Sequence, residues 1–398
     1  MVGRMLICSM LFSLNVAGQE VETVSQGNTS FLKGKLLLLQ QYLDSAACRK
    51  VDPRYIEVPA KPWRVVVRYK ENAVDVNYDN HINHGGTNEA ADWQMHFNPP
   101  VTSSVGFWVG YRGTGISYSK SLAKNDETYF SFNTTGAKYG FDFWLRQFNT
   151  SAVTLTAKDY KDGEVVGDFK LDTFMPAPVR ISSLYLNGYY VFNGHRYSQA
   201  AAYNQSVIQR HSAGSLLVGA TWFQSTFDYS DGRNLWYVLL SQNTSKIKVH
   251  QANIGLGYGY NWVPLRGLLF NVMVMPTVSF YSRVKVYKYG SNFDLSPKEA
   301  TDNYGEYDTK TRKWENGKTE KSALMFKRDD YVCYWNAGTE TDYSVLRFNL
   351  DMRLGIVYNW KDYFAGIQAQ FDHFSYKKDY NKVGLTEAYV RIALGLRL

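Results

Sequence analysis

The chain has 398 residues, of which 45% are hydrophobic, 16% aromatic and only 20% charged, with a formal net charge of +8. Aromatic residues favour strands, so this composition argues against a helix-rich soluble protein, and a mean hydropathy of -0.35 argues against a bundle of membrane helices. The length allows two average domains or one large all-β domain.

Residues 1–18 have the pattern of a secretory signal peptide. Arg4 supplies the basic end, residues 5–14 supply the apolar core, and Val16 and Gly18 are the small residues before a cut that we expect at Gln19. A buried N-terminal helix is the alternative. Because an exported chain does not routinely meet nucleic acid, we expect the positive charge to face lipopolysaccharide or to line a lumen.

Residues 19–61 are predicted to form a periplasmic segment ahead of the first strand. Leu32, Leu36, Leu39 and Leu43 recur there at helical spacing, and Ser30 can serve as an N-cap. The sequence therefore predicts a short helix that packs against the rim of the following domain.

Residues 62–398 are predicted to form a transmembrane antiparallel β-barrel. The segment "NIGLGYGYNW" (253–262) and its echo "DMRLGIVYNW" (351–360) place aliphatic and aromatic residues on one face and mainly glycine and polar residues on the other. Aromatic residues gather at one end of each segment, which is typical of a lipid-facing band that ends in an aromatic girdle. A strand of a soluble sandwich also alternates, but it seldom ends in such an aromatic ladder.

About twelve strands are expected, an even number as in single-chain bacterial barrels. Tight turns, such as "NGH" after Phe192, alternate with polar stretches at about 160–178, 228–246 and 288–340, which we interpret as extracellular loops. Pro276 cannot donate to a ladder, so a bulge, or a strand that has left the membrane, is expected there. The expected strands are near residues 63–72, 103–111, 114–121, 127–134, 138–148, 180–192, 211–227, 247–262, 267–287, 341–359, 363–377 and 386–398.

Several longer strings resemble a known family. They are "RYIEVPAKPWRV", "VGFWVGYRGTGISYS", "TTGAKYGFDFWLRQF", "LYLNGYYVFNGHRYSQAAAYNQSVIQRHSAGSLLVGA" and "IGLGYGYNWVPLRG". They resemble an uncharacterised outer-membrane barrel family of Bacteroidota, a domain-of-unknown-function family, from about residue 30 to the C-terminus. The resemblance supports the barrel and implies no activity, cofactor or catalytic residue.

No catalytic residue is predicted. Asp372, His373 and Ser375 contain the residue types of a nucleophilic set, but Asp372 and His373 alternate faces on a strand, which separates a base from the group that would orient it. The nucleophile motif Gly-x-Ser-x-Gly does not occur.

No metal or cofactor site is predicted either. His81 and His84 in "HINHGG" lack a third and fourth ligand, so a polar surface loop is the favoured interpretation. Cys48 and Cys333 are too few for a disulfide framework and match no metal motif, which leaves open only whether they form a single bridge.

The inward positions of the predicted strands carry polar and charged residues. Charges inside a barrel of this size either pair into a plug or line a narrow polar path, and opposite charges on the last strands favour a structural ion-pair network. With Asp372 beside them, the luminal candidates are Asp142, Arg146, Asp351, Arg353, Gln368, Gln370, Arg391 and Arg397.

The sequence therefore predicts a porin-like protein of the bacterial outer membrane: a small channel, a transport accessory or a docking platform, and not an enzyme. Its expected partners are outer-membrane lipid, lipopolysaccharide, the barrel-assembly machinery during biogenesis and a further, unidentified protein, with nucleic acid excluded. An outer-membrane hydrolase that acts on lipid or peptide is the alternative, followed by a secreted soluble β protein.

Overall fold

The chain forms two compact units, Met1–Ser45 and Ala46–Leu398, in a computed structural model. The second unit is described at residues 51–83, 88–97, 99, 101–122, 127–234, 237–238, 241, 244–288, 307–308, 313–314, 324–328, 331–335, 339–344, 347–378 and 381–398. The first is described at residues 34, 35, 37, 38, 40, 41 and 43–45. The predicted signal peptide and Cys48 lie outside the described residues.

The described residues of the first unit are helical, within the segment where a short helix is predicted. Leu37 and Leu38 are exposed there. Among the described residues, no helix is both long enough and apolar enough to cross a membrane.

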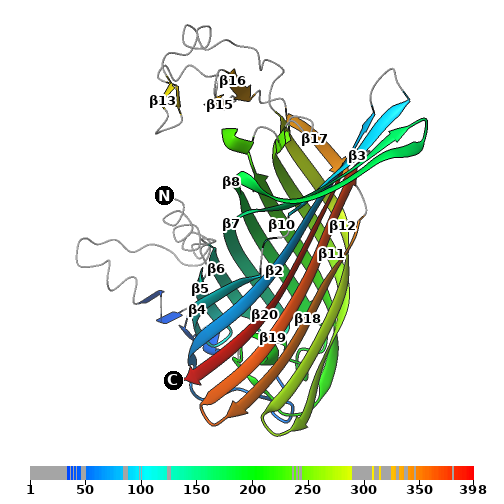
Figure 1. The fold of residues 1–398 in the computed structure, drawn as a ribbon. Coiled ribbons are helices and arrows are strands. Elements are labelled where there is room, and N and C mark those ends of the chain that lie inside the picture. Colours follow the sequence, from blue (N-terminus) through cyan, green and yellow to red (C-terminus); the bar gives the residue numbers. More distant parts are fainter. Residues whose placement is uncertain are drawn as a thin grey trace, which may run out of the picture. The chain divides into compact units, whose positions relative to one another are not determined.

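Twelve strands described in the second unit close into one antiparallel ring, because β20 (Asn381–Arg397) pairs with β2 (Trp63–Asn83) and β11 pairs with β12 (Figure 1). The predicted all-β antiparallel barrel is confirmed. From β2 onward, the ring order is β4 (Thr102–Tyr111), β5 (Thr114–Ser121), β6 (Thr128–Thr135), β7 (Tyr139–Lys161), β8 (Glu164–Val191), β10 (Ala213–Asp228), β11 (Thr244–Leu265), β12 (Leu268–Lys288), β18 (Phe348–Trp360), β19 (Tyr363–Lys378) and β20.

We call the end of the barrel where β2 begins and β20 ends the terminus end, and the opposite end the loop end. At the terminus end β11 and β12 are joined by a turn at Arg266 and Gly267, and Gly267 has a φ of +87°, which glycine adopts without steric cost. Short connections there also join β4 to β5, β6 to β7 and β18 to β19.

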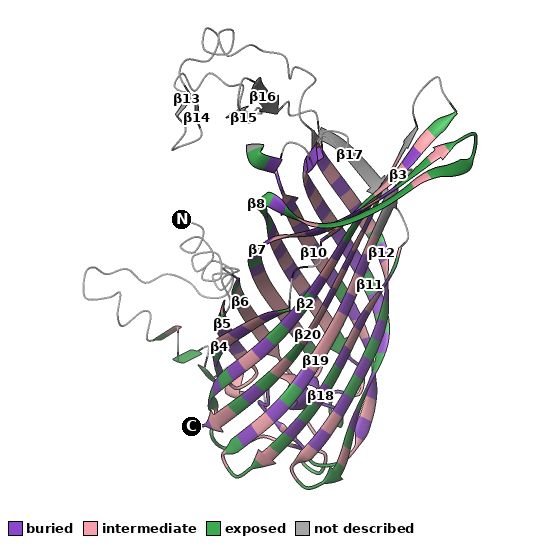
Figure 2. Ribbon diagram, in the orientation of Figure 1, coloured by how far each residue is buried: buried purple, intermediate pink, exposed green. Residues whose placement is uncertain are grey.

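Exposed and buried residues alternate along the ring strands (Figure 2). In β11 the outward side chains are 41–59% exposed, whereas Asn253 and Asn261 are at most 1% exposed. The same alternation holds in β18, so the predicted faces of both segments are confirmed. The exposed outward side chains of β11 are Ile254, Leu256, Tyr258, Tyr260 and Trp262.

Aromatic rings gather on the outer surface at the terminus end. Trp360 lies 5.6 Å from Tyr358 and 6.1 Å from Tyr363 between ring centroids, and Trp63 lies 5.0 Å from Tyr111. This arrangement is the predicted girdle.

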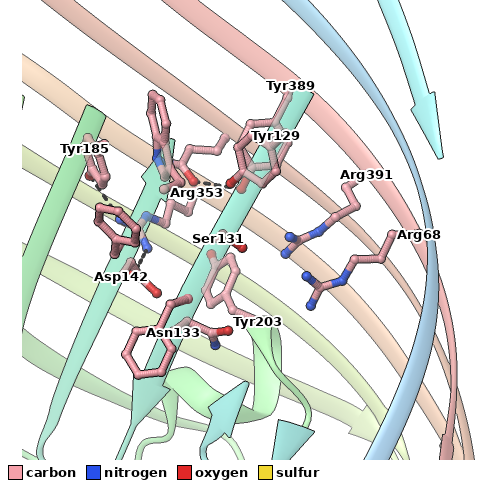
Figure 3. Close-up of a pocket in the computed structure, with 14 residues that line it drawn as sticks. Arg68, Tyr129, Ser131, Asn133, Asp142, Tyr185, Tyr203, Arg353, Tyr389 and Arg391 are labelled. Atoms are coloured by element: carbon pink, nitrogen blue, oxygen red, sulfur yellow. Dashed lines mark hydrogen bonds and ion pairs between the residues drawn. The ribbon is translucent and has the colours of Figure 1, made fainter. Parts of the chain in front are cut away.

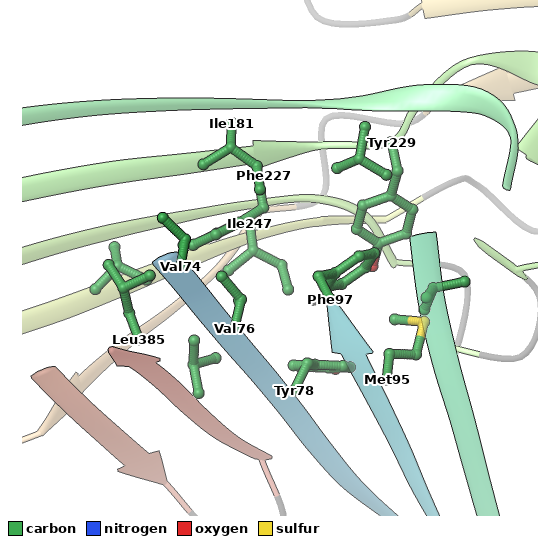
Figure 4. Packing of buried hydrophobic residues seen from close by; sticks show 14 of the residues in the cluster. Val74, Val76, Tyr78, Met95, Phe97, Ile181, Phe227, Tyr229, Ile247 and Leu385 are labelled. Carbon is green, nitrogen blue, oxygen red and sulfur yellow. The ribbon is translucent and has the colours of Figure 1, made fainter. Parts of the chain in front are cut away.

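The polarity of the two faces inverts toward the loop end. In β2 the inward residues change from Arg68 and Lys70 to Val74 and Val76, while polar residues such as Asn77 turn outward. Inward residues of other strands join Val74 and Val76 in one buried apolar cluster, which includes Ile181, Phe223, Phe227, Ile247, Phe374 and Leu385 (Figure 4). In β2 the loop end is therefore built like a strand of a soluble protein, apolar inside and polar outside, although the loop-end part of β8 exposes apolar side chains such as Phe169 and Phe174.

Two predicted polar loops are partly strand. Most of residues 160–178 continue β7 and β8, which are joined by a hairpin at Asp162 and Gly163. β3 (Glu89–Phe97), which was not predicted, pairs with both β2 and β7. Because β4, β5 and β6 are short, β3 fills the space between β2 and β7 beyond them. Within the expected loop 228–246, the 3-10 helix η1 (Gly232–Asn234) precedes the start of β11 at Thr244.

Pro276 lies within β12 without a register shift, so the expectation of a bulge at this residue is wrong, and the alternative of a strand that has already left the membrane stays a prediction. Its Cα partner in β18 is Leu350, and the β11 ladder omits the two positions that face Met275 and Pro276. The β11–β12 ladder is thus interrupted at the position where Pro276 has no backbone N–H to donate. Of the three register shifts in this ladder, one lies four residues further along, where Phe280 is the extra residue between the partners of Ala252 and Asn253.

Much of the expected loop 288–340 lies outside the described residues. Its described backbone pieces are β13 (Tyr307–Asp308), β14 (Lys313–Trp314), β15 (Leu324–Arg328) and β16 (Tyr331–Trp335), which pair as β13–β14 and β15–β16. The segment expected as one strand over 341–359 is divided into β17 (Thr339–Ser344) and β18, which both pair with β12.

Candidate functional site: the barrel lumen

A buried ion-pair network crosses the middle of the lumen. The Arg353 guanidinium on β18 donates to both carboxylate oxygens of Asp351, at 3.0 and 2.8 Å, and to Asp142 on β7 at 3.2 Å. The side chains of Arg353 and Asp351 are 6% and 7% exposed. Three predicted luminal residues are therefore brought together, and they tie opposite parts of the ring to each other.

A second network is centred on Arg146. Its guanidinium donates to Glu127 at 3.0 Å and to Glu387 at 3.5 Å, and the Asn72 side-chain amide also donates to Glu127. Glu127 is fully buried. Both networks agree with the preference for structural ion pairs over an open polar path.

The remaining predicted luminal residues form a third group on β19 and β20. Arg391 donates to the Gln368 side-chain oxygen, and Gln370 donates to Asp372 at 2.7 Å. Arg397 lies apart from them at the terminus end, where it donates to the Asn359 side chain at 2.5 Å.

The connection between β8 and β10 begins with a turn over residues 192–196, which confirms the predicted "NGH" turn, and then folds into the terminus end of the lumen. It contains α3 (Gln199–Tyr203), which begins at the N-cap Ser198, and β9 (Ile208–Gln209), which pairs with β1 (Ile56–Glu57). We call residues 197–209 the plug. Its alanines, Ala200, Ala201 and Ala202, are at most 3% exposed and cluster with Leu269 and Val357 of the barrel wall.

Barrel side chains hold the plug through its backbone carbonyls. Gln368 donates to the Ala202 carbonyl at 2.6 Å, Arg64 donates to that of Asn204, and Arg397 donates to that of Gln205 at 3.3 Å. Cationic donors suit the carbonyl-rich end of a short helix. The chain itself thereby occupies the terminus end of the lumen.

The segment before β1 contacts the turn that leads into the plug. The backbone N–H of Asp52 donates to the His195 carbonyl at 2.8 Å. The Arg54 side chain donates to the Asp52 carboxylate at 2.9 and 3.1 Å, and this hydrogen bonding holds the pKa of Asp52 below its usual value.

Between the plug and the loop-end cluster lies a polar cavity of about 70 Å³ (Figure 3). Arg68 and Arg391 point into it from neighbouring strands, and Tyr129, Tyr203 and Tyr389 also line it. It is the space next to the ion-pair network, since Asp142 and Arg353 form another part of its wall.

The outer surface carries a basic patch at the loop end, where β11 pairs with β12. Lys248 lies directly opposite Lys285, and His250 lies opposite Arg283. Partial burial, together with the charges of Arg283, Lys248 and Lys285, lowers the pKa of His250. The ammonium groups of Lys248 and Lys285 lie 5.4 and 5.0 Å from the Tyr287 ring.

The two sites weighed from the sequence are not assembled. Asp372 is buried on the inner face and bonds Gln370, whereas His373 contacts Thr386 at 2.9 Å on the other side of the strand. His81 lies in β2 rather than in a loop and contacts Asp92 at 2.5 Å, while His84 lies outside the described residues. A search of the described part of the chain finds no group of three metal-ligating side chains.

Residues 50–397 match the model of a protein family described as "Domain of unknown function (DUF4421)". The chain belongs to this family. No curated protein matches it. This DUF4421 chain is similar to the outer membrane protease OmpT from Escherichia coli, with 8% sequence identity, coverage of 85% of this chain and 97% of that chain, and a TM-score of 0.34. It is also similar to the outer membrane protein OprG from Pseudomonas aeruginosa, with 10% identity, coverage of 84% of this chain and 98% of that chain, and a TM-score of 0.25. A third similar structure is the translocator domain of the autotransporter NalP from Neisseria meningitidis, with 7% identity, coverage of 94% of this chain and 100% of that chain, and a TM-score of 0.23.

Sequence reasoning missed several luminal residues of this DUF4421 chain. Arg64, Arg68 and Lys70 share one face of β2, and their even spacing in "WRVVVRYKEN" is a signal that could have found them. Glu127 stands at the edge of a predicted strand, and nothing local indicates that it meets Arg146. The plug carries no strand pattern at all.

Proposed function

We propose that this protein is an outer-membrane β-barrel that takes part in transport and is closed at rest. The support for membrane insertion is the exposed aliphatic belt, which Leu256 and Leu354 represent, and the aromatic girdle at its terminus end. From Trp63 to Asn72, where the polarity of β2 inverts, the strand has about the 9–11 residues that a tilted strand needs to cross a bilayer. The inverted loop-end half then stands in water.

The orientation that fits this belt has the terminus end in the periplasm and the loop end outside the cell, because barrels carry short periplasmic turns and long extracellular loops. The basic patch of Lys248, Arg283 and Lys285 then lies just above the belt. Like charges directly opposite one another are destabilising unless an anion lies between them, so the patch suits lipopolysaccharide phosphates. We also propose that the protein comes from Bacteroidota. Its further proposed partners are the barrel-assembly machinery during biogenesis and one unidentified protein.

The main support for the proposed closed state is the position of the plug inside the lumen. Its buried alanines fill the lumen, and three of its carbonyls are held by Gln368, Arg64 and Arg397. Toward the loop end the lumen is filled by apolar side chains, where the rings of Phe223 and Phe374 stack at 4.3 Å. Hydrophobic constrictions exclude ions by dewetting, so both halves oppose free conduction. Transport would require the plug to move.

The proposed role is not enzymatic. The opposite faces of Asp372 and His373 support it, because a base and its orienting acid must share a hydrogen bond. The hydrolase that the sequence left as an alternative would need a nucleophile, a base and an acid that meet on one face.

A disulfide lock tests whether the plug is a gate. A Cβ built at Gly355 would lie 3.6 Å from the Cβ of Ala202, within the range for a disulfide. The variant A202C/G355C should be silent in planar bilayers when oxidised and should regain the brief openings of the wild type when reduced. The single variant A202C is the matched control.

A second variant replaces residues 197–209 with a short Gly-Ser turn and should conduct steadily. Equal conductance of the wild-type, locked and plug-free barrels would refute the gate. Silence of all three, each with heat-modifiable mobility that shows a folded barrel, would leave a docking platform and refute transport.

A further inference from the structure

Arg68 is a buried cation for which the described part of the protein provides no hydrogen-bonding or ionic partner. It is 6% exposed, its Nε atom is buried without a hydrogen bond, and no carboxylate oxygen lies within 4.0 Å of its guanidinium. Its guanidinium carbon lies 5.1 Å from the centroid of the Trp108 ring. A buried charge without a counter-charge is costly, so this arrangement calls for an anion.

Arg391 lines the same cavity, and Lys70 lies on the wall beside it. Lys70 follows Arg68 on the inner face of β2 and lies directly opposite Arg391 of β20. The Lys70 ammonium lies 4.1 Å from the Tyr129 ring and 4.2 Å from the Tyr389 ring, and Arg391 bonds only the neutral Gln368. Among the described residues, none of the three cations forms an ion pair. The carboxylates nearby are engaged elsewhere, since Asp142 binds Arg353 and Glu127 binds Arg146.

The two arginines face a cavity rather than packed atoms. Figure 3 shows both guanidinium groups directed into the space that Tyr203, Ser131 and Asn133 border from the other side. The cavity of about 70 Å³ has room for the oxygens of one small anionic group, since about 10–15 Å³ of such volume already holds one water.

We propose that the lumen holds a small oxyanion, a phosphate or carboxylate group, between Arg68 and Arg391. Guanidinium groups present paired N–H donors that match the oxygens of such groups, and hydrogen bonds between charged partners are the strong ones. The anion would be free in solution or would be the charged end of a longer molecule. The site goes beyond the proposed transport role and does not depend on it, because an anion can be bound in a barrel whose plug never moves.

Isothermal titration of the refolded barrel with potassium phosphate, and separately with potassium acetate, tests the site. The wild type should bind at least one of the two, and R68Q and R391Q should each bind about tenfold more weakly or worse, because each loses charged hydrogen bonds. R266Q removes an equal charge from an exposed turn and should bind within about twofold of wild type. Both probes support the proposal if they bind; phosphate alone would identify a tetrahedral anion and acetate alone a planar one.

A measurement of the unfolding temperature without added oxyanion tests whether Arg68 lacks a partner within the protein. Because Arg68 then has no partner, R68Q should unfold at the same temperature as the wild type or higher. The proposal is overturned if the wild type binds neither probe, if R68Q and R391Q bind as R266Q does, or if R68Q fails to form a heat-modifiable barrel without an anion. A conductance result on the plug leaves all these outcomes unchanged.

Discussion

Arg353 neutralises two acids at the centre of the lumen, and its removal should destabilise the barrel far more than the loss of an exposed charge. In Arg353→Met the methionine fills similar space but leaves Asp351, which is 7% exposed, and Asp142 without their cation. Breaking one partner of a buried ion pair typically costs about 3–5 kcal/mol. The Asp142 side chain is 27% exposed and borders the cavity, so water can solvate it in part, and we expect the lower end, about 3 kcal/mol.

Equilibrium unfolding in urea, followed by tryptophan fluorescence in phospholipid vesicles, measures this free energy. The triple variant R353M/D351N/D142N removes the charges together, and it should recover most of the loss because a charge-free interior of similar volume is often neutral. R266M is the control for loss of an exposed charge. A free energy of unfolding for R353M within about 0.5 kcal/mol of wild type, or a triple variant as unstable as R353M, would refute the reasoning.

Two further predictions concern the barrel wall. Leu256→Arg places a charge on the outer belt and should cost about 2–4 kcal/mol of unfolding free energy in vesicles, and a wild-type value would remove the lipid-facing assignment. Gly115→Ala should cost about 1–3 kcal/mol, because the new Cβ would lie 2.1 Å from the buried Trp108 ring, whereas Gly355→Ala meets its nearest atom at 3.6 Å and should stay within about 0.5 kcal/mol in the same assay. Equal stability of the two alanine variants would contradict the packing around Trp108.

For the inward glycines, the sequence predicts which face of the strand they occupy but not which side chain packs over them. Alternation correctly places Gly257 and Gly355 on the inner face. The buried Trp108 ring lies over two other inward glycines, Gly110 and Gly115, where an added Cβ would lie 2.0 and 2.1 Å from it. A Cβ at Gly257 would lie 2.7 Å from the Val274 carbonyl oxygen of the neighbouring strand, so even serine is poorly accommodated there. Which residue lies over which glycine depends on strand register, and local alternation does not specify register.

The strands and their faces follow from the sequence alone, because side chains alternate with a period of two and a single strand records which of them are apolar. The segments of β11 and β18 identify both the belt and the girdle in this way, and the apolar inward residues Val74 and Val76 already encode the inverted loop end. Alternation by itself does not show the inversion, because an alternating strand looks the same whichever of its faces is in contact with water.

The contents of the lumen are decided by the tertiary structure. Arg146 and Glu387 are 241 residues apart and meet only because the ring closes, and no local pattern contains that distance. The plug is a further case: its helix of five residues is too short to be stable by itself and persists because the barrel supplies an apolar wall and three donors. The sequence by itself therefore determined a barrel with an apolar outer surface. Closure of the ring decided which charges pair, which remain without partners, and that the chain fills the terminus end of its own lumen.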